Sequence, residues 1–343
     1  MRHHKHNSIL SMGKGKGKGK DKGTTAADGG GIWSGGAVDF SALPEGCIAH
    51  ILSFTSPQDV CRSASVSSTF RSAAEADAVW ERFLPLEYGD EISDAVSKIF
   101  PPFASKKELY FHLCRVPVLI HGGAKSFSLD KKTGKKCFMI APRELFIVWG
   151  DAPRYWRWTS DPESRFVELA ELLSVCWLEI RGKIETEMLS PGTLYAAYMV
   201  FKLTTSNGFQ RQPVKVGVGL VGSEVTKQTA YLENVDSEWR QRHPIVSRGI
   251  GLFNLNRRRV TISTQVAMPH ETTRNNAPAE DCSHRIVPKE REDGWLEVQL
   301  GVFFHDGRVN GELEMSVLEV KGGHWKSGLL IQGIEIRPKD LTT

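Results

Sequence analysis

Residues 195–203 read YAAYMVFKL, and this stretch indicates the fold class. Tyr195, Ala197, Met199, Phe201 and Leu203 alternate with their neighbours at a period of two, the period of a β-strand. Further runs with strand-like composition or alternation lie at 143–149, 177–185, 295–300, 312–320 and 329–336. Many short strands of this kind favour an antiparallel sandwich or jelly roll.

Two segments within this β-rich region do not follow the strand pattern. Residues 167–173 predict a helix that interrupts the strands, and residues 206–292 give the least certain assignment. The tryptophans Trp177, Trp295 and Trp325 are predicted mainly to fill the core, as aromatic side chains in a sandwich usually do.

Helical patterns precede the strands, at residues 39–86. Pro44 suits a first helical turn, and Ile48, Ile51 and Leu52 then recur at helical spacing. Ser-Pro-Gln-Asp at 56–59 is a capping-box-like start for a second helix. Four short helices bury little surface, so an apolar face left over would need a partner.

The later helix starts in this region are also marked by capping residues. Ser67 or Ser68 can cap a third helix, and Asp77 can cap a last turn that carries Trp80. Residues 87–136 are predicted to be a helical linker, since Ser105 opens another capping-box pattern. Within that linker the lysine-rich stretch 131–136 predicts a hairpin tip with its lysines in water, with a nuclear-localisation signal as the alternative.

Residues 1–38 are rich in glycine and lysine and are predicted to be a disordered tail, because they offer little to bury. A nuclear-targeting or nucleic-acid-binding role for the tail is the less favoured interpretation. His3, His4 and His6 lack other ligands nearby, so no metal site is predicted.

The overall composition fits a soluble globular protein of about two domains. The chain has 343 residues, 40% hydrophobic and 24% charged, and a net charge of only +4, which does not by itself imply a nucleic-acid or membrane partner. No apolar run approaches a membrane span, and Met1–Met12 lacks the apolar core of a secretory signal. Six scattered cysteines predict reduced thiols rather than a disulfide framework.

The helical region resembles an F-box. The matching positions include Leu43-Pro44-Glu45, Ile48, Ile51-Leu52, Val66-Ser67, Phe70-Arg71 and Trp80. The resemblance implies docking to the Skp-type adaptor of a cullin-based ubiquitin ligase. It also implies that the following residues lie at or support that interface: Leu43, Pro44, Ile48, Ile51, Leu52, Val60, Val66 and Trp80.

Residues 137–339 resemble the phloem lectin family, whose sugar-binding namesake is Nictaba. The motifs that carry the likeness are LFIVW at 145–149, YWRW at 155–158, VCWLEIRGKI at 175–184, YAAYMVFK at 195–202, DGWLEV at 293–298 and GIEIRP at 333–338. Together the two resemblances predict an α+β chain of two domains, a small all-α F-box module followed by an antiparallel, jelly-roll-like β-sandwich.

The lectin resemblance implies a carbohydrate site. A tryptophan ring offers a flat apolar surface to the C–H face of a sugar, and carboxylates accept from its hydroxyls. The family's tryptophan pair matches Trp149 and Trp156, while Glu312 and Glu314 fall in the segment of its glutamates. Trp158 is an alternative to Trp156. The family implies glycans of the GlcNAc or N-glycan class.

Three functions remain open from the sequence. The first is a substrate receptor of a ubiquitin ligase that reads glycoproteins; the second keeps the adaptor but binds a protein surface; the third is a stand-alone lectin. The sequence contains no GxSxG, HExxH or P-loop motif, so no catalytic residue, cofactor or metal is predicted. The expected partners are the adaptor, through it a cullin complex, and glycoproteins in the nucleus and cytoplasm, without membrane or nucleic acid.

Overall fold

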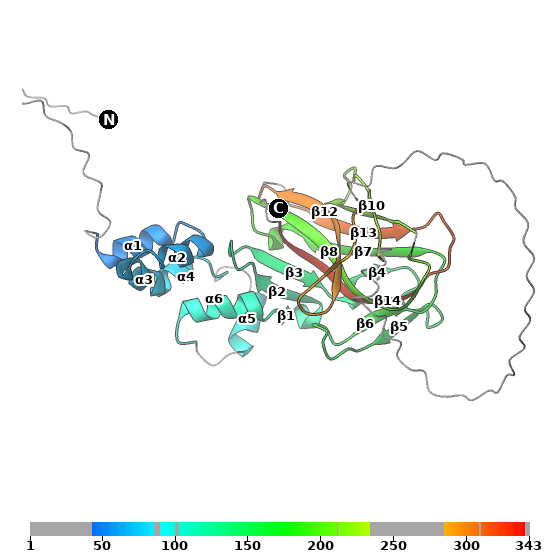
Figure 1. Cartoon of the computed structure of the whole chain (residues 1–343), viewed down its shortest axis with the longest axis horizontal. Helices are drawn as coiled ribbons and strands as arrows, with labels where there is room; N and C mark the ends of the chain where they lie inside the picture. The colour runs from blue at the N-terminus through cyan, green and yellow to red at the C-terminus, as the bar shows by residue number, and fades with distance from the viewer. Residues whose placement is uncertain are drawn as a thin grey trace, which may run out of the picture. The chain divides into compact units, whose positions relative to one another are not determined.

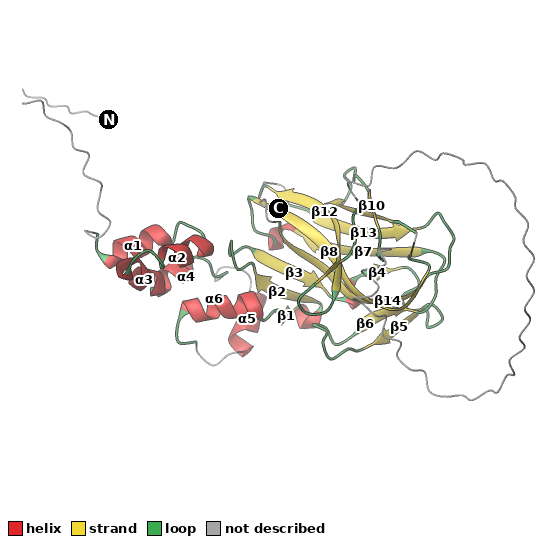
Figure 2. Ribbon diagram, in the orientation of Figure 1, coloured by secondary structure: helices red, strands yellow, loops and turns green. Residues whose placement is uncertain are grey.

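The computed structural model describes residues 43–85, 90–99, 103–210, 212–233, 285–308 and 310–339. The predictions for the tail at 1–38, its histidines and Cys282 lie outside these described residues. Within them, six α-helices come first along the chain and the strands of two antiparallel sheets follow (Figure 1; Figure 2). The predicted fold class, helices followed by an antiparallel β domain, is confirmed. No helix among the described residues is long and apolar enough to cross a membrane.

The first four helices form a small module at residues 43–85. They are α1 (Glu45–Leu52), α2 (Pro57–Ser63), α3 (Ser68–Glu75) and α4 (Asp77–Glu81). The hydroxyl of Ser56 accepts from the Asp59 N–H at 3.1 Å, and Ser67 accepts from the Phe70 N–H at 3.2 Å, so both predicted caps are confirmed. Asp77 does not cap α4; its carboxylate accepts instead from the Lys106 N–H at 2.8 Å.

Trp80 is the centre of the core of this helical module. Its indole N–H donates to the Ala74 carbonyl at 2.7 Å, which satisfies the one polar atom of a fully buried ring. The ring lies 5.1 Å from Tyr110 and 5.2 Å from Phe111, both on α6 (Lys106–Arg115). The helices up to α4 therefore share their core with α6, which follows α5 (Asp90–Ile99).

The stretch predicted as a helical linker, residues 87–136, is helical only up to Arg115. Strands β1 (Val118–Ile120) and β2 (Lys125–Leu129) follow and pair antiparallel with each other. The two glycines at 122 and 123 interrupt the alternation there, which hides the strand period in the sequence. The second half of this stretch therefore belongs to the β domain.

A hairpin tip is confirmed between β2 and β3 (Lys136–Ile140). The prediction that its lysines lie in water is wrong for Lys136, which starts β3 and is buried. A carboxylate oxygen of Asp130 accepts from the Thr133 N–H at 2.8 Å, an arrangement that closes a tight turn. The tip also contacts the helical module, because the Gln58 N–H donates to the Lys132 carbonyl at 3.2 Å.

Strands β8 (Thr193–Asn207) and β14 (Ser327–Pro338) are the centre of a nine-stranded sheet. Its order is β1-β2-β3-β14-β8-β12-β11, and β14 also pairs with β6, which pairs with β5. The remaining strands are β5 (Trp156–Thr159), β6 (Leu169–Leu172), β11 (Lys289–Glu290) and β12 (Leu296–His305). The alternating stretch that opened the sequence analysis is thus a fully paired central strand, with Met199 opposite Val298 and Ile334.

The second sheet has five strands in the order β10-β9-β13-β7-β4. They are β4 (Phe146–Ile147), β7 (Leu178–Glu185), β9 (Val214–Leu220), β10 (Gln228–Ala230) and β13 (Glu312–Glu319). The two sheets enclose the core, and Gly182 of β7 is closely packed against it. A methyl group there would lie 2.9 Å from Leu145 Cδ2 and 3.1 Å from Ile334 Cδ1.

The predicted helix at 167–173 is wrong, because β6 occupies these positions. Leu169, Ala170 and Leu172 are buried, and Ala170 lies opposite Ile331 of the central β14. These residues have good helix propensity, but helix propensity is a weak preference, and pairing with a central strand overrides it. Short 3-10 turns connect strands elsewhere, at His121–Gly123, Pro142–Glu144 and Thr186–Met188.

Candidate ligand loop and adaptor face

The segment from the end of β4 into β5, which we call the tryptophan loop (residues 147–158), contains a series of tight turns. The Gly150 N–H donates to the Ile147 carbonyl, the Ala152 N–H to the Trp149 carbonyl and the Tyr155 N–H to the Ala152 carbonyl, each at 2.9 Å. These turns pair three backbone N–H groups of the loop with carbonyls of the loop itself.

Two indoles, one buried and one half-buried, donate hydrogen bonds to backbone carbonyls of this loop. Trp156 is only 2% exposed, and its indole N–H donates to the Val148 carbonyl at 3.2 Å. The indole N–H of Trp158 donates to the Gly150 carbonyl at 3.1 Å, and the Arg143 guanidinium covers that ring at 3.6 Å. The structure therefore corrects the assignment of Trp156: its ring lies in the core and presents no face to a sugar.

Trp149 is the tryptophan that the loop presents. It is 43% exposed and has a φ of +59°, a left-handed conformation that costs a bulky residue roughly 1–3 kcal/mol. Its ring lies 5.0 Å from the ring of Tyr155 at an angle of 33°. Strain of this kind is concentrated at functional sites, which makes the Trp149–Tyr155 pair the best candidate for an aromatic platform.

Glu312 and Glu314 lie on β13, on the outer face of the five-stranded sheet. Glu312 pairs with Lys183 at 2.6 Å and Glu314 with Arg181 at 2.5 Å. Strand register places Glu312 opposite Glu185, whereas the Val148 N–H bonds the Glu179 carbonyl. Six residues of β7 separate these two levels, roughly 20 Å at strand rise, so the structure does not bring Glu312 to Trp149.

On β7, the residue level with the loop is Glu179, whose carbonyl accepts from the Val148 N–H. Its carboxylate accepts from the Trp177 indole N–H at 3.1 Å and from Arg181 at 2.8 Å. Burial alone would raise the pKa of Glu179, but the bonds from Arg181 and Trp177 outweigh burial and lower it. The sequence analysis missed Glu179, although Trp177, Glu179 and Arg181 alternate along one strand face.

The exposed tryptophans differ from the predicted core assignment. Trp295 is fully buried as expected, but Trp177 and Trp325 are exposed. Phe146, opposite Arg181 on β4, is exposed as well. This end of the sheet therefore carries more exposed aromatic surface than a single stacked tryptophan provides.

The helical module has three exposed large apolar side chains, which together we call the adaptor face. They are Ile51, Phe54 and Val66, and the last two are 61% and 76% exposed. Phe54 lies in the turn after α1, and Val66 lies between α2 and α3. Side chains this apolar and this exposed are typical of surfaces that a partner covers.

The eight residues predicted for adaptor binding divide into two groups. Pro44, Ile51 and Val66 are exposed and Leu43 is half-buried, so these can contact a partner. The other four are buried in the core beneath them: Ile48, Leu52, Val60 and Trp80. Phe54 belongs to the exposed group and was missed, because it lies one turn beyond the helical pattern.

Two family matches cover the same two parts of the chain. Residues 40–85 match the F-box-like family, and residues 135–338 match the family described as phloem protein 2. The chain belongs to the phloem protein 2 family. It is an F-box protein with a phloem protein 2 domain, which is a lectin-type domain.

Relatives in Arabidopsis thaliana combine the same parts. The chain is 48% identical to the F-box protein At2g02240 over 90% of its own length and 83% of the relative's. It is 44% identical to the F-box protein PP2-B1 over 88% of its length and 90% of the relative's, and 42% identical to the F-box protein PP2-B10 over 87% and 94%.

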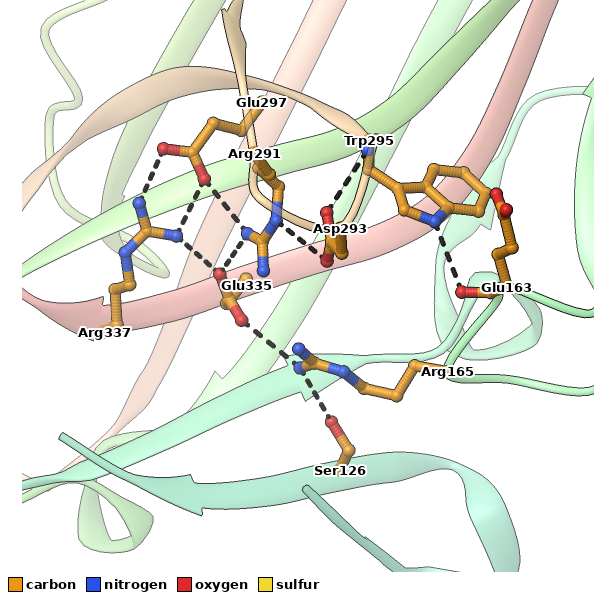
Figure 3. A network of polar contacts seen from close by, with 9 residues as sticks. All are labelled: Ser126, Glu163, Arg165, Arg291, Asp293, Trp295, Glu297, Glu335 and Arg337. Carbon is orange, nitrogen blue, oxygen red and sulfur yellow. Dashed lines mark hydrogen bonds and ion pairs between the residues drawn. The ribbon is translucent and has the colours of Figure 1, made fainter. Parts of the chain in front are cut away.

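A buried ionic network stabilises the phloem protein 2 domain on the nine-stranded sheet (Figure 3). The carboxylate of Glu335 on β14 accepts hydrogen bonds from Arg291 at 2.6 Å, Arg337 at 2.5 Å and Arg165 at 3.2 Å. Burial would raise the pKa of Glu335, but the arginines outweigh it and lower the pKa to about 2. Glu297 accepts from Arg291 and Arg337, so the cations are engaged within the network.

The described part of the phloem protein 2 domain and of the F-box holds no group of three or more metal-ligating side chains. Both domain types are typically non-catalytic. The tryptophan loop and the adaptor face are the two exposed surfaces that we consider as candidates for ligand binding.

Proposed function

We propose that this protein is the substrate receptor of a Skp–cullin type ubiquitin ligase. Its F-box binds the Skp-type adaptor, and its phloem protein 2 domain binds glycans on target glycoproteins. The observation that carries the proposal is one chain with two sets of exposed apolar side chains: Ile51, Phe54 and Val66 on the F-box, and Trp149 on the lectin-type domain.

The adaptor face supports the first half of the proposal. Truncating or charging a central apolar anchor of an interface commonly costs 2 kcal/mol or more, roughly 30-fold in affinity. Substitution of Ile51 and Val66 by aspartate is therefore expected to abolish capture of the adaptor by the full chain. Capture that persists in that variant would overturn the assignment of the face.

The strained Trp149 supports the second half. A sugar ring packed on Trp149 beside Tyr155 would find two aromatic surfaces and the Glu179 carboxylate at the same end of the sheet. One such site predicts weak binding, roughly micromolar to millimolar. The glycan class we propose is GlcNAc-containing oligomers and N-glycan cores, and a glycan array of the full chain tests it.

A second candidate is that the phloem protein 2 domain binds a protein surface without sugar. The exposed aromatic residues Phe146, Trp177 and Trp325 favour it, because they offer more apolar surface than one sugar requires. An empty glycan array together with retained adaptor binding would favour this candidate. A stand-alone lectin would give the opposite result, glycan binding without adaptor capture.

In this proposal the chain itself catalyses nothing, and ubiquitin transfer is performed by the other subunits. The proposed location is the nucleus and cytoplasm, where cullin complexes act. Fractionation of cells that express the tagged full chain tests this location.

A further inference from the structure

The backbone on both sides of Trp149 is bonded by an indole N–H. The Val148 carbonyl accepts from Trp156 at 3.2 Å, and the Gly150 carbonyl accepts from Trp158 at 3.1 Å. Trp149 lies between these two carbonyls with a φ of +59°. A strained residue keeps such a conformation only where its surroundings determine it, so these two hydrogen bonds help to hold Trp149 in place.

The two indoles differ in what holds them in turn. Trp156 is 2% exposed and is fixed by the core around it, whereas Trp158 is half-buried. The Arg143 guanidinium covers the Trp158 ring and lies 3.6 Å from its centroid. Tryptophan is the aromatic ring that a cation prefers, and arginine is the cation found most often in such contacts. The orientation of Trp158 therefore depends in part on Arg143.

Arg143 is held over that ring by a carboxylate. Its Nε donates to Glu168 Oε2 at 3.0 Å and its Nη2 to Glu168 Oε1 at 2.7 Å, a bidentate pair that fixes the plane of the guanidinium. These bonds lower the pKa of the Glu168 carboxyl, so the pair stays charged at neutral pH. Arg143 lies in the 3-10 turn that precedes β4, and Glu168 directly precedes β6. A chain of contacts thus runs from the start of β6 to the residue after Trp149.

We propose that Arg143, oriented by Glu168, is a positioning residue for Trp149 and acts on it through Trp158. This role rests on the proposed function, in which Trp149 is the glycan platform, and it extends that function to two exposed residues outside the platform. A surface that is already held in its bound shape loses less freedom on binding, so a looser loop should bind the same glycan more weakly.

The chain offers a matched control in a second arginine–glutamate pair, on β5 and β6 (Figure 1). Arg157 lies opposite Glu171, and its Nε and Nη2 donate to Glu171 Oε2 at 3.0 and 2.8 Å. Arg157 is exposed like Arg143 and is the direct neighbour of Trp158 in the sequence. Because Arg143 is the residue that covers the Trp158 ring, loss of Arg157 removes the same charge and a similar ion pair but leaves that cover in place.

Hydrogen exchange reports on the tryptophan loop without any ligand. The N–H groups of Gly150, Ala152 and Tyr155 each donate to a loop carbonyl at 2.9 Å, so their exchange measures opening of the loop. In the full chain we expect Arg143→Gln to speed this exchange about 3- to 5-fold, through the loss of one cation–π contact. Arg157→Gln should change it less than about 1.5-fold. Urea denaturation of each variant establishes that it folds as the parent does.

A Trp158→Phe background tests the route of the effect. Phenylalanine keeps a ring beneath Arg143 but has no N–H for the Gly150 carbonyl. We expect Trp158→Phe alone to speed exchange about 5-fold, and the addition of Arg143→Gln to change it less than about 1.5-fold further. If Arg143 stabilised the domain in general, its substitution would have the same effect in both backgrounds.

Calorimetric titration with the trimer of N-acetylglucosamine measures the consequence for binding. We expect the affinity of the full chain to fall about 3- to 5-fold in Arg143→Gln and to stay within about 1.5-fold of the parent in Arg157→Gln. Arg143→Lys keeps the charge but not the flat bidentate pair, so it should recover only part of the lost affinity.

The proposal is overturned if Arg143→Gln and Arg157→Gln have equal effects on exchange, or if Arg143→Gln keeps its full effect in the Trp158→Phe background. A looser loop with unchanged affinity for the trimer would overturn the role in binding. Failure of the parent to bind the trimer would contradict the proposed glycan class instead. The exchange results would then still support or overturn the hold of Arg143 on Trp149, because they need no ligand.

Discussion

The indole N–H of Trp156 donates to the carbonyl of Val148, 3.2 Å away, and so fixes the residue directly before Trp149. One tryptophan of the loop is thus a buried support and the other is the exposed surface. The two roles predict opposite results when each residue is changed.

Changing Trp149 to glycine should remove ligand binding without loss of stability. Glycine accepts the φ of +59°, so relief of strain offsets its greater freedom in the unfolded chain. We expect the free energy of unfolding to stay within about 1 kcal/mol of the parent and glycan affinity to fall at least about 10-fold. Urea denaturation and titration with an array-positive glycan measure both quantities.

Changing Trp156 to phenylalanine should lower stability more than it weakens glycan binding. The Val148 carbonyl loses its donor and the core loses volume, so the free energy of unfolding should fall by about 1–3 kcal/mol. Binding should weaken only as the loop loosens. A Trp156→Phe variant as stable as the parent would show that this bond does not hold the loop.

The close packing around Gly182 predicts that a methyl group is not tolerated there. Gly182→Ala would meet Leu145 Cδ2 at 2.9 Å, and overpacking of this kind costs about 1–3 kcal/mol. Gly46→Ala is the control, because that exposed helical position has no atom within 4 Å of the added carbon. Alanine there should stabilise by up to about 1 kcal/mol, as measured by urea denaturation. Equal effects at both sites would contradict the packing described.

The ionic network predicts a specific loss of stability in acid. The pKa of Glu335 is lowered to about 2 from an ordinary value of 4.5, so its contribution to stability is complete above pH 4.5. That contribution, on the order of 3 kcal/mol, is lost as the pH falls from 4.5 toward 2, because the unfolded state then binds the proton more readily.

Glu335→Gln cannot titrate, so its free energy of unfolding should fall less over that pH range than that of the parent. At neutral pH the variant should be the less stable of the two, because Arg165, Arg291 and Arg337 lose their shared carboxylate. Parallel stability profiles of the two proteins between pH 5 and pH 2 would contradict this account.

The elements that the sequence predicted are those with a local physical cause. The alternation at 195–203 predicted a strand, which is present. The serines at 56, 67 and 105 predicted helix starts, and their hydroxyls cap those helices. The strand at 169–172 was missed because its residues favour a helix locally, and only pairing with β14 decides otherwise.

The candidate site was only partly predictable, for a related reason. The sequence does not show whether a tryptophan is buried beneath a loop or exposed on it. The burial of Trp156 depends on the strands packed around it. The distance between Glu312 and Trp149 depends on the register of β13 against β7, which no local pattern encodes. The buried Lys136 was likewise predicted in water, since its hairpin tip alone gives no sign of Ser190 beside it.

The most direct test of the receptor proposal is a three-component pull-down. Immobilised Skp-type adaptor is mixed with the full chain and a glycoprotein bearing the array-positive glycan. We expect the parent to bind the adaptor and to retain the glycoprotein. Trp149→Gly should bind the adaptor without retaining the glycoprotein, and the Ile51→Asp, Val66→Asp variant should not bind the adaptor at all. Retention of the glycoprotein by Trp149→Gly to the same extent as by the parent would contradict the account.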